Sequence, residues 1–184
     1  MKKKASVLDL ISKHYKLIIL ALIAMIIFNQ WIVFVITVIL FTFLGMSSVS
    51  LSRVMPQISI ETITPSAILV GYIWGWQFGL GFGLIVGMVS YVNASQMNLT
   101  TIICSLLMGL VGVLAFLFKD LGFNFFWSFQ IVYFIRANLS YFLISRINSN
   151  VVENIMHSYV ESIYNMVIIV NFMTLFHGII ISLI

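Results

Sequence analysis

Residues 66–92 read SAILVGYIWGWQFGLGFGLIVGMVSYV, an apolar stretch that contains six glycines. Gly79, Gly83 and Gly87 recur every four residues, so on a helix they form one stripe along which a second backbone can approach closely. The stretch is too long for one comfortable membrane span and predicts two short helices that meet near Gly75. The first, of about ten residues, is shorter than a full span, so we expect it to be re-entrant or to merge into one tilted helix. Glycine stripes are packing devices first, and we interpret this one as a helix contact rather than a ligand contact.

The composition of the whole chain excludes a water-soluble domain. Of its 184 residues, 62% are hydrophobic and 8% are charged, and the mean hydropathy is +1.15. Soluble domains carry roughly 25% charged residues, which a water-facing surface requires. The sequence therefore predicts an all-α, polytopic membrane helix bundle with about six transmembrane helices. Residues 17–184 form its single transmembrane domain, after a basic N-terminus at residues 1–16.

The positive charge of the chain is concentrated at its start. Five of the nine basic residues lie within residues 1–16, followed by an apolar run at 17–44. Basic residues beside a first span favour the cytoplasmic side, so we expect a multi-pass protein of the cell membrane with a cytoplasmic N-terminus. This pattern does not indicate nucleic-acid binding. The run at 17–44 is too long for a signal peptide, and we expect it to be retained.

Further apolar runs and polar loops follow from the same pattern. The run at 17–44 is broken only at Asn29 and Gln30, and as one helix it would be roughly 42 Å long. It is either one long tilted span or a hairpin that turns at these two residues. We expect the later spans and the polar loops between them at the following positions: spans at 99–118, 125–144 and 162–184, and loops at 45–65, 93–98 and 148–161.

The side on which the loops lie depends on the first run. If 17–44 is one span and 66–92 a hairpin, all three polar loops lie outside, while the turn near Gly75, the pair Lys119 and Asp120, and the C-terminus lie inside. If 17–44 is a hairpin, every later loop changes side.

Arg136 is the least expected residue, because it lies well inside the apolar run 125–144. A charge at the centre of a membrane helix costs roughly 2.5–3.5 kcal/mol unless it faces a cavity or a partner. The two interpretations are a structural ion pair with Glu161 or Glu61, and a site whose guanidinium binds a ligand anion.

Other polar residues gather near the three loops. Glu161 and Asn165 are four residues apart and share a helix face, with Tyr164 adjacent to it. With single-span topology they open on the same side as Glu61, Asn93 and Gln96. Convergent polar groups in an apolar cavity define a binding site for a small polar solute. The candidate substrate-binding residues are therefore Glu61, Asn93, Gln96, Arg136, Glu161, Tyr164 and Asn165.

Catalytic and metal-binding motifs are not found in the sequence. The histidines are scattered, and there is no H-x-x-x-H, C-x-x-C, G-x-S-x-G or G-x-x-x-x-G-K pattern. We therefore expect no enzyme, no metal and no cofactor, and interpret Cys104 as a small buried hydrophobic residue. Without a nucleotide-binding motif, active uptake would need an ion gradient or a partner with an ATPase.

The order of features from Glu61 to residue 118 resembles a known family. Glu61-Thr-Ile-Thr-Pro65 precedes Ala67-Ile-Leu-Val-Gly-Tyr, then Gly75-Trp-Gln-Phe-Gly79, and later Gly109-Leu-Val-Gly112. This order resembles the substrate-binding S component of energy-coupling factor (ECF) vitamin transporters, and is similar to MreD-type cell-shape proteins of the same fold.

The resemblance to S components implies a six-helix bundle that captures its ligand near the outer surface and topples, driven by partners. These partners would be a transmembrane coupling subunit and ABC-type ATPases, besides membrane lipid. S components often dock the coupling subunit through A-x-x-x-A on the first helix, and the nearest pair here is Ala21 and Ala24.

Three hypotheses follow. The first is a solute-binding subunit of an ECF-like importer, for a vitamin, a nucleobase or another small polar solute. The second is an MreD-like membrane scaffold without transport. The third is an ion-coupled carrier that acts alone and relies on Arg136 and His177.

Overall fold

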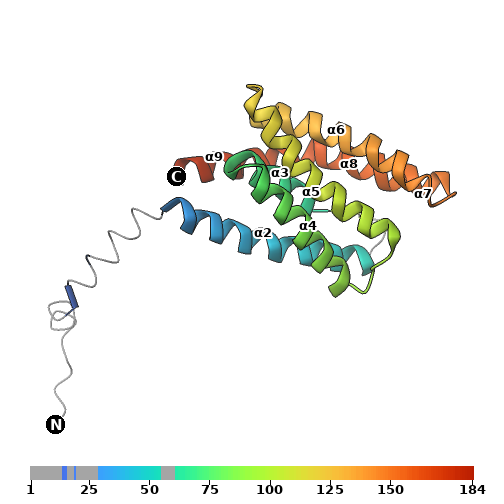
Figure 1. The fold of residues 1–184 in the computed structure, drawn as a ribbon, viewed down its shortest axis with the longest axis horizontal. Helices are drawn as coiled ribbons and strands as arrows, with labels where there is room; N and C mark the ends of the chain where they lie inside the picture. The colour runs from blue at the N-terminus through green and yellow to red at the C-terminus, as the bar shows by residue number, and fades with distance from the viewer. Residues whose placement is uncertain (1–13, 16–18, 20–28, 55–60) are drawn as a thin grey trace, which may run out of the picture.

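The computed structural model describes residues 14–15, 19, 29–54 and 61–184, and their fold is entirely helical (Figure 1). The first five long helices are α2 (Asn29–Val54), α3 (Ile63–Trp74), α4 (Trp76–Asn93), α5 (Leu99–Asp120) and α6 (Phe125–Ile144). The sixth is a continuous helix over Val151–Leu183. It consists of α7 (Val151–Ile155), a π-helical segment (Met156–Val160), α8 (Glu161–Tyr164), a second π-helical segment (Asn165–Ile169) and α9 (Val170–Leu183). The predicted all-α helix bundle is thereby confirmed.

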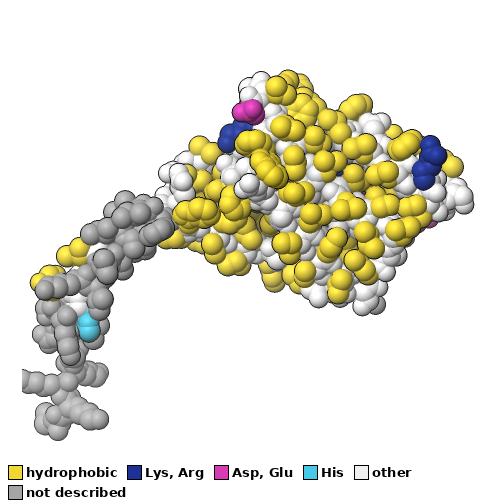
Figure 2. Space-filling model, in the orientation of Figure 1, with side chains coloured by type: hydrophobic (Ala, Val, Ile, Leu, Met, Phe, Trp, Pro, Cys, Tyr) yellow, Lys and Arg dark blue, Asp and Glu magenta, His cyan; other side chains and the backbone are white. Residues whose placement is uncertain are grey.

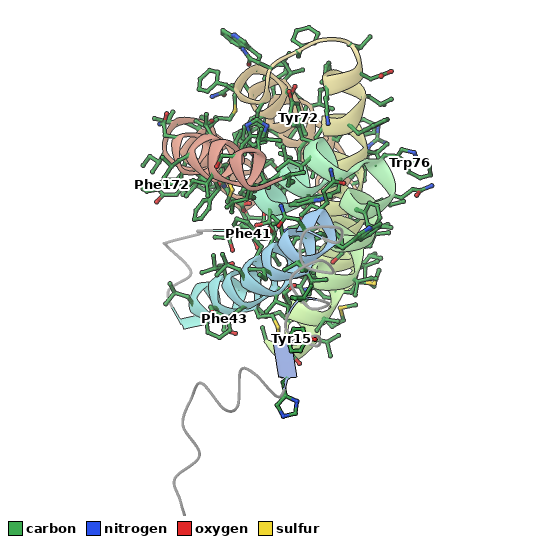
Figure 3. All side chains as sticks on the ribbon, turned by 90° about the vertical axis from the view of Figure 1, so that its left-hand side faces the viewer. Tyr15, Phe41, Phe43, Tyr72, Trp76 and Phe172 are labelled. Carbon is green, nitrogen blue, oxygen red and sulfur yellow. The ribbon has the colours of Figure 1, made fainter. Side chains whose placement is uncertain are left out.

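Three of the described helices are long and apolar enough to cross a membrane: Asn29–Leu51, Leu99–Asp120 and Val151–Leu183. Apolar side chains cover the outside of the bundle as well as its core. Phe41 of α2 is 1% exposed and points into the bundle, whereas Phe43 on the same helix is 68% exposed and points away from it (Figure 3). Figure 2 shows hydrophobic side chains over most of the visible face, with charged ones near the α5–α6 connection and the end of α6. An apolar exterior is the surface that lipid tails solvate.

The short helix α3 is the centre of the bundle. It contacts α2, α4, α5, α6 and α9, and lies between these helices in Figure 1. Its residues from Ile63 to Tyr72 are all buried. A helix of 12 residues is only about 18 Å long, and it is separated from α4 by Gly75, whose φ of +111° favours glycine. The predicted break near Gly75 is correct, and the short helix does not merge with the next one.

The glycine stripe brings α4 against α5 and α3. A Cβ atom on Gly83 would lie 2.1 Å from the carbonyl oxygen of Met108, and one on Gly79 would lie 2.6 Å from Cα of Gly71 and 2.9 Å from Cα of Gly112. No side chain larger than hydrogen fits at these backbone contacts. The stripe is therefore the helix-packing device that its spacing predicts.

Two expected loops are largely helical, and these predictions were wrong. The loop predicted at 45–65 is helix as far as Val54 and again from Ile63, and the loop predicted at 148–161 is helix from Val151. The hydroxyl groups of Ser47 and Ser48 donate to the carbonyl oxygens of Phe43 and Gly45, at 2.8 and 2.9 Å. Serines that bond to their own helix satisfy their polar groups without ending it, so polar composition overestimated the loops.

The connections lie at two opposite ends of the bundle, which we call the Gly75 end and the Asn98 end. At the Gly75 end, the amide of Asn29 donates to the carbonyl oxygen of Leu183, and Tyr72 donates to the carbonyl oxygen of Phe123. The Asn98 end holds Glu61 and Thr62 before α3, and the connections at 94–98 and 145–150. The expected polar loops thus share one end. The helix α2 begins at Asn29. The choice between a span and a hairpin at 17–44 depends on residues 16–18 and 20–28, which lie outside the described residues. Ala21 and Ala24 are among them.

The glycine contacts yield a matched pair of variants on α4. Gly83→Ala forces a Cβ into the carbonyl group of Met108 and should destabilise the protein by about 1–3 kcal/mol. Gly81→Ala has no heavy atom within 4 Å of its new Cβ and should leave stability unchanged or slightly raised. Thermal unfolding of the detergent-solubilised full chain measures both. Equal melting temperatures for the two variants would contradict the close contact between α4 and α5.

Candidate functional site: a buried charged cluster

Arg136 is buried in the bundle and pairs with two carboxylates at once. It lies on α6 and is 4% exposed. Its Nη2 is 2.8 Å from Oε2 of Glu61, and its Nη1 is 3.2 Å from Oε1 of Glu161. Glu61 precedes α3 and Glu161 begins α8, so the guanidinium joins three segments that are far apart in sequence. The two carboxylates that the sequence offered as alternative partners both bind it. We call these three residues the charged cluster.

Glu61 also holds the start of the central helix. Its Oε1 accepts hydrogen bonds from the backbone N–H of Thr64 at 2.7 Å and from the Thr64 hydroxyl at 2.8 Å. The free N–H groups in the first turn of a helix need such acceptors, and a carboxylate there also interacts favourably with the helix dipole. Position 61 therefore links the beginning of α3 to Arg136 of α6.

The charged cluster carries one positive group and two carboxylates, all within an apolar interior. Its burial costs several kcal/mol per ion, and the ion pairs and the Thr64 hydrogen bonds offset that cost. The ring of Tyr133, three residues before Arg136 on α6, lies 5.8 Å from the guanidinium carbon. With both carboxylates ionised the charged cluster has a net charge of −1, and the hydrogen-bonding capacity of its groups is not exhausted.

Three buried polar atoms on or beside the charged cluster have no hydrogen-bond partner in the described part of the chain. They are Nε of Arg136, the hydroxyl oxygen of Tyr133 and Oδ1 of Asn165. Asn165 lies one turn beyond Glu161 and donates its Nδ2 to the Glu161 carbonyl oxygen at 2.9 Å. An unmade hydrogen bond in a protein interior costs about 1–3 kcal/mol, so such groups call for an explanation.

The other predicted site residues are not part of the charged cluster. Tyr164 is half-buried on α8, Asn93 is exposed at the end of α4, and Gln96 is half-buried in the following connection. In residues 61–184, no hydrogen bond or ion pair joins Asn93 or Gln96 to the cluster; the backbone of Gln96 instead accepts from the Thr101 hydroxyl at 3.1 Å. Their role in binding stays a prediction.

We did not predict Thr64, Tyr133 or the π-helical segments on both sides of Glu161–Tyr164 from the sequence. Two signals could have found the first two: Thr64 follows Glu61 by three residues at a helix start, and Tyr133 precedes Arg136 by three on one helix face. A π-helical turn has no comparably simple signature, although such turns occur often at functional sites. Here the two segments flank α8, which carries the buried Glu161.

His177 lies apart from Arg136. Its ring stacks on Phe125 with centroids 4.7 Å apart and planes at 2°, and Phe125 lies at the other end of α6, about 16 Å along the helix from Arg136. Cys104 is buried, as expected. Among the described residues, no three His, Cys, Asp or Glu side chains lie close enough together to hold a metal ion.

Comparison with known proteins gives no relative. No family model, no curated protein and no solved structure matches this chain.

Removing Arg136 should expose the dependence of the fold on the charged cluster. Arg136→Ala leaves two carboxylates buried without their cation and should destabilise the protein by about 3–5 kcal/mol. The triple variant Glu61→Gln, Arg136→Met, Glu161→Gln carries no charge there and should recover much of that loss. Arg146→Ala, which removes an exposed arginine from the same segment, should change stability by less than about 1 kcal/mol. The melting temperatures of the three variants are compared by thermal unfolding. An Arg136→Ala protein that is as stable as Arg146→Ala would refute a stabilising role of the two Arg136 ion pairs.

Proposed function

We propose that this chain is a membrane-embedded, solute-binding subunit of an ECF-like importer, with a binding rather than a catalytic role. Three helices with the length and hydropathy of membrane spans support its place in the bilayer. We further propose that it is a multi-pass protein of the cell membrane, with the basic N-terminus on the cytoplasmic side. If residues 17–44 belong to one span, the Asn98 end, which lies at the far end of α2 from Asn29, faces outward.

The observation that carries the proposal is the set of unpaired polar atoms on and beside the charged cluster. Arg136 Nε is a donor, Asn165 Oδ1 is an acceptor, and the Tyr133 hydroxyl can do both. A small polar solute with both donors and acceptors would pair with these groups once the surrounding side chains move apart to admit it. Binding would then offset the free-energy cost of the hydrogen bonds that these buried groups do not make within the protein.

The proposed solute is a vitamin, a nucleobase or a molecule of similar size and polarity. Uptake requires an energy source, and the sequence contains no nucleotide-binding motif. The resemblance to S components implies a transmembrane coupling subunit and ABC-type ATPases, which are the proposed partners, with Ala21 and Ala24 as the candidate docking residues.

A second candidate function is an MreD-like scaffold that binds envelope proteins through its helices. The double ion pair favours it, because Arg136 already has two carboxylate partners and does not need a ligand to neutralise it. The two candidates differ in what co-purifies with the full chain. A coupling subunit with paired ATPases supports the importer, and cell-wall synthesis proteins support the scaffold.

Asn165→Leu separates solute binding from folding. The change removes the unpaired oxygen while leaving both ion pairs of Arg136, so stability of the free protein should hold or rise. Asn171→Leu is the matched control, because Asn171 makes the same bond to a carbonyl oxygen four residues earlier but is exposed. The melting temperature of each full-length variant is measured with a panel of B vitamins and nucleobases.

The importer hypothesis predicts that at least one compound raises the melting temperature of the original protein and of Asn171→Leu. The same compound should raise that of Asn165→Leu less, by an amount that corresponds to at least about tenfold weaker binding. If no compound changes the melting temperature of the original protein, the solute-binding role is rejected. If a compound acts equally on all three proteins, Asn165 is not part of the site.

A further inference from the structure

A second polar feature, separate from the charged cluster, is a pocket at the Asn98 end. It lies where the start of α5, the end of α6 and the start of α7 meet, near the end of the bundle where Figure 1 labels α7. Its volume is about 180 Å³, which corresponds to roughly six water molecules. All but one of its lining residues are polar: Asn98, Thr100, Thr101, Ile144, Asn148, Glu153 and Asn154.

Hydrogen bonds hold the walls of this pocket in place. The amide of Asn148 donates to Oε2 of Glu153 at 3.1 Å, and the amide of Asn154 donates to the carbonyl oxygen of Asn148 at 2.7 Å. On the opposite wall, Oδ1 of Asn98 accepts from the backbone N–H of Thr101 at 2.9 Å and caps α5. The pocket is therefore lined by hydrogen-bonded groups from the ends of α5, α6 and α7 and from the connections 94–98 and 145–150 beside them.

The polar atoms of this pocket that can still form hydrogen bonds are acceptors. Asn154 is 1% exposed, and within the described residues its Oδ1 has no hydrogen-bond partner although its Nδ2 is bound. Glu153 is the one charged residue of the lining, and Asn148 binds its Oε2 but not its Oε1 among the described contacts. The nearby Arg146 does not line the pocket, and its guanidinium stacks on the ring of Phe142 at 5.0 Å.

These groups define the chemistry of an occupant. Glu153 is exposed at the pocket and Asn154 is buried, so an occupant that donates several hydrogen bonds and carries positive charge can pair with both. An anion would be repelled by Glu153. A bare metal ion would fill only a small part of the volume, whereas an ammonium group with a short organic chain fits it.

We propose that this pocket binds a small molecule or headgroup with a primary ammonium group, which donates to Glu153 and Asn154. The ammonium belongs either to a free amine or to the headgroup of phosphatidylethanolamine, since the chemistry is the same. This site goes beyond the proposed importer function and is compatible with the scaffold function as well, because it shares no residue with the charged cluster.

Three probes of similar size and different charge test the proposal. Ethanolamine, ethylene glycol and glycolate are added to the full chain in detergent at neutral pH and equal ionic strength, and the melting temperature is followed. Ethanolamine should raise it in a saturable way, and the neutral and anionic probes should not. Glu153→Gln keeps the size of the side chain and should weaken the ethanolamine effect by at least about tenfold, because a charge-assisted bond is lost. Asp120→Asn removes one carboxylate at the Gly75 end and should not change it.

The lipid source is tested in nanodiscs of phosphatidylcholine, with and without phosphatidylethanolamine. Stabilisation by phosphatidylethanolamine that also abolishes the ethanolamine effect identifies a headgroup, and an ethanolamine effect in both membranes identifies a free amine. The proposal is overturned if neither acts, if glycolate acts as well as ethanolamine, or if Glu153→Gln responds like the original protein. Asn165→Leu should retain the ethanolamine response, so failure here is distinct from failure of the importer function.

Discussion

The ion pairs of Arg136 with Glu61 and Glu161 are the interaction on which the rest of the bundle depends. They connect α6 to the start of the central helix α3 and to the last helix, in an interior that offers charged groups no water. Removing Arg136 alone would leave two buried carboxylates without their cation, which costs more than most single mutations, so the guanidinium must stay between them. The positions of α3, α6 and α8 relative to one another are fixed by this requirement.

The glycine contacts provide the complementary constraint on the other side of α3. The charged cluster connects the helices in the Asn98 half of the bundle. Nearer the Gly75 end, Gly71, Gly79 and Gly112 let the backbones of α3, α4 and α5 come into close contact. One device is electrostatic and the other steric. Together they hold a central helix that is too short to cross a bilayer alone.

Much of this arrangement could be predicted from sequence because strong local signals specify it. The span predicted at 125–144 is the observed α6, and the break at Gly75 follows from glycine at a turn. Polar residues misled the loop predictions at 45–65 and 148–161. Ser47 and Ser48 bond to carbonyl groups of their own helix, and Glu161 is buried against Arg136. Sequence also named both carboxylates near Arg136, but only three-dimensional structure shows that both bind it at once. The π-helical segments and the pocket at Asn154 depend on packing between distant segments, and no local pattern indicates them.

We propose that the polar groups around Arg136 bind a small solute in addition to stabilising the fold. Native mass spectrometry of the full chain, released from detergent after gentle purification, tests this most directly. Solute binding predicts a second peak whose mass exceeds that of the protein by the mass of one small polar molecule. This second peak should be weaker for Asn165→Leu than for Asn171→Leu. A chain that carries only lipid and detergent adducts, before and after incubation with candidate solutes, would contradict it.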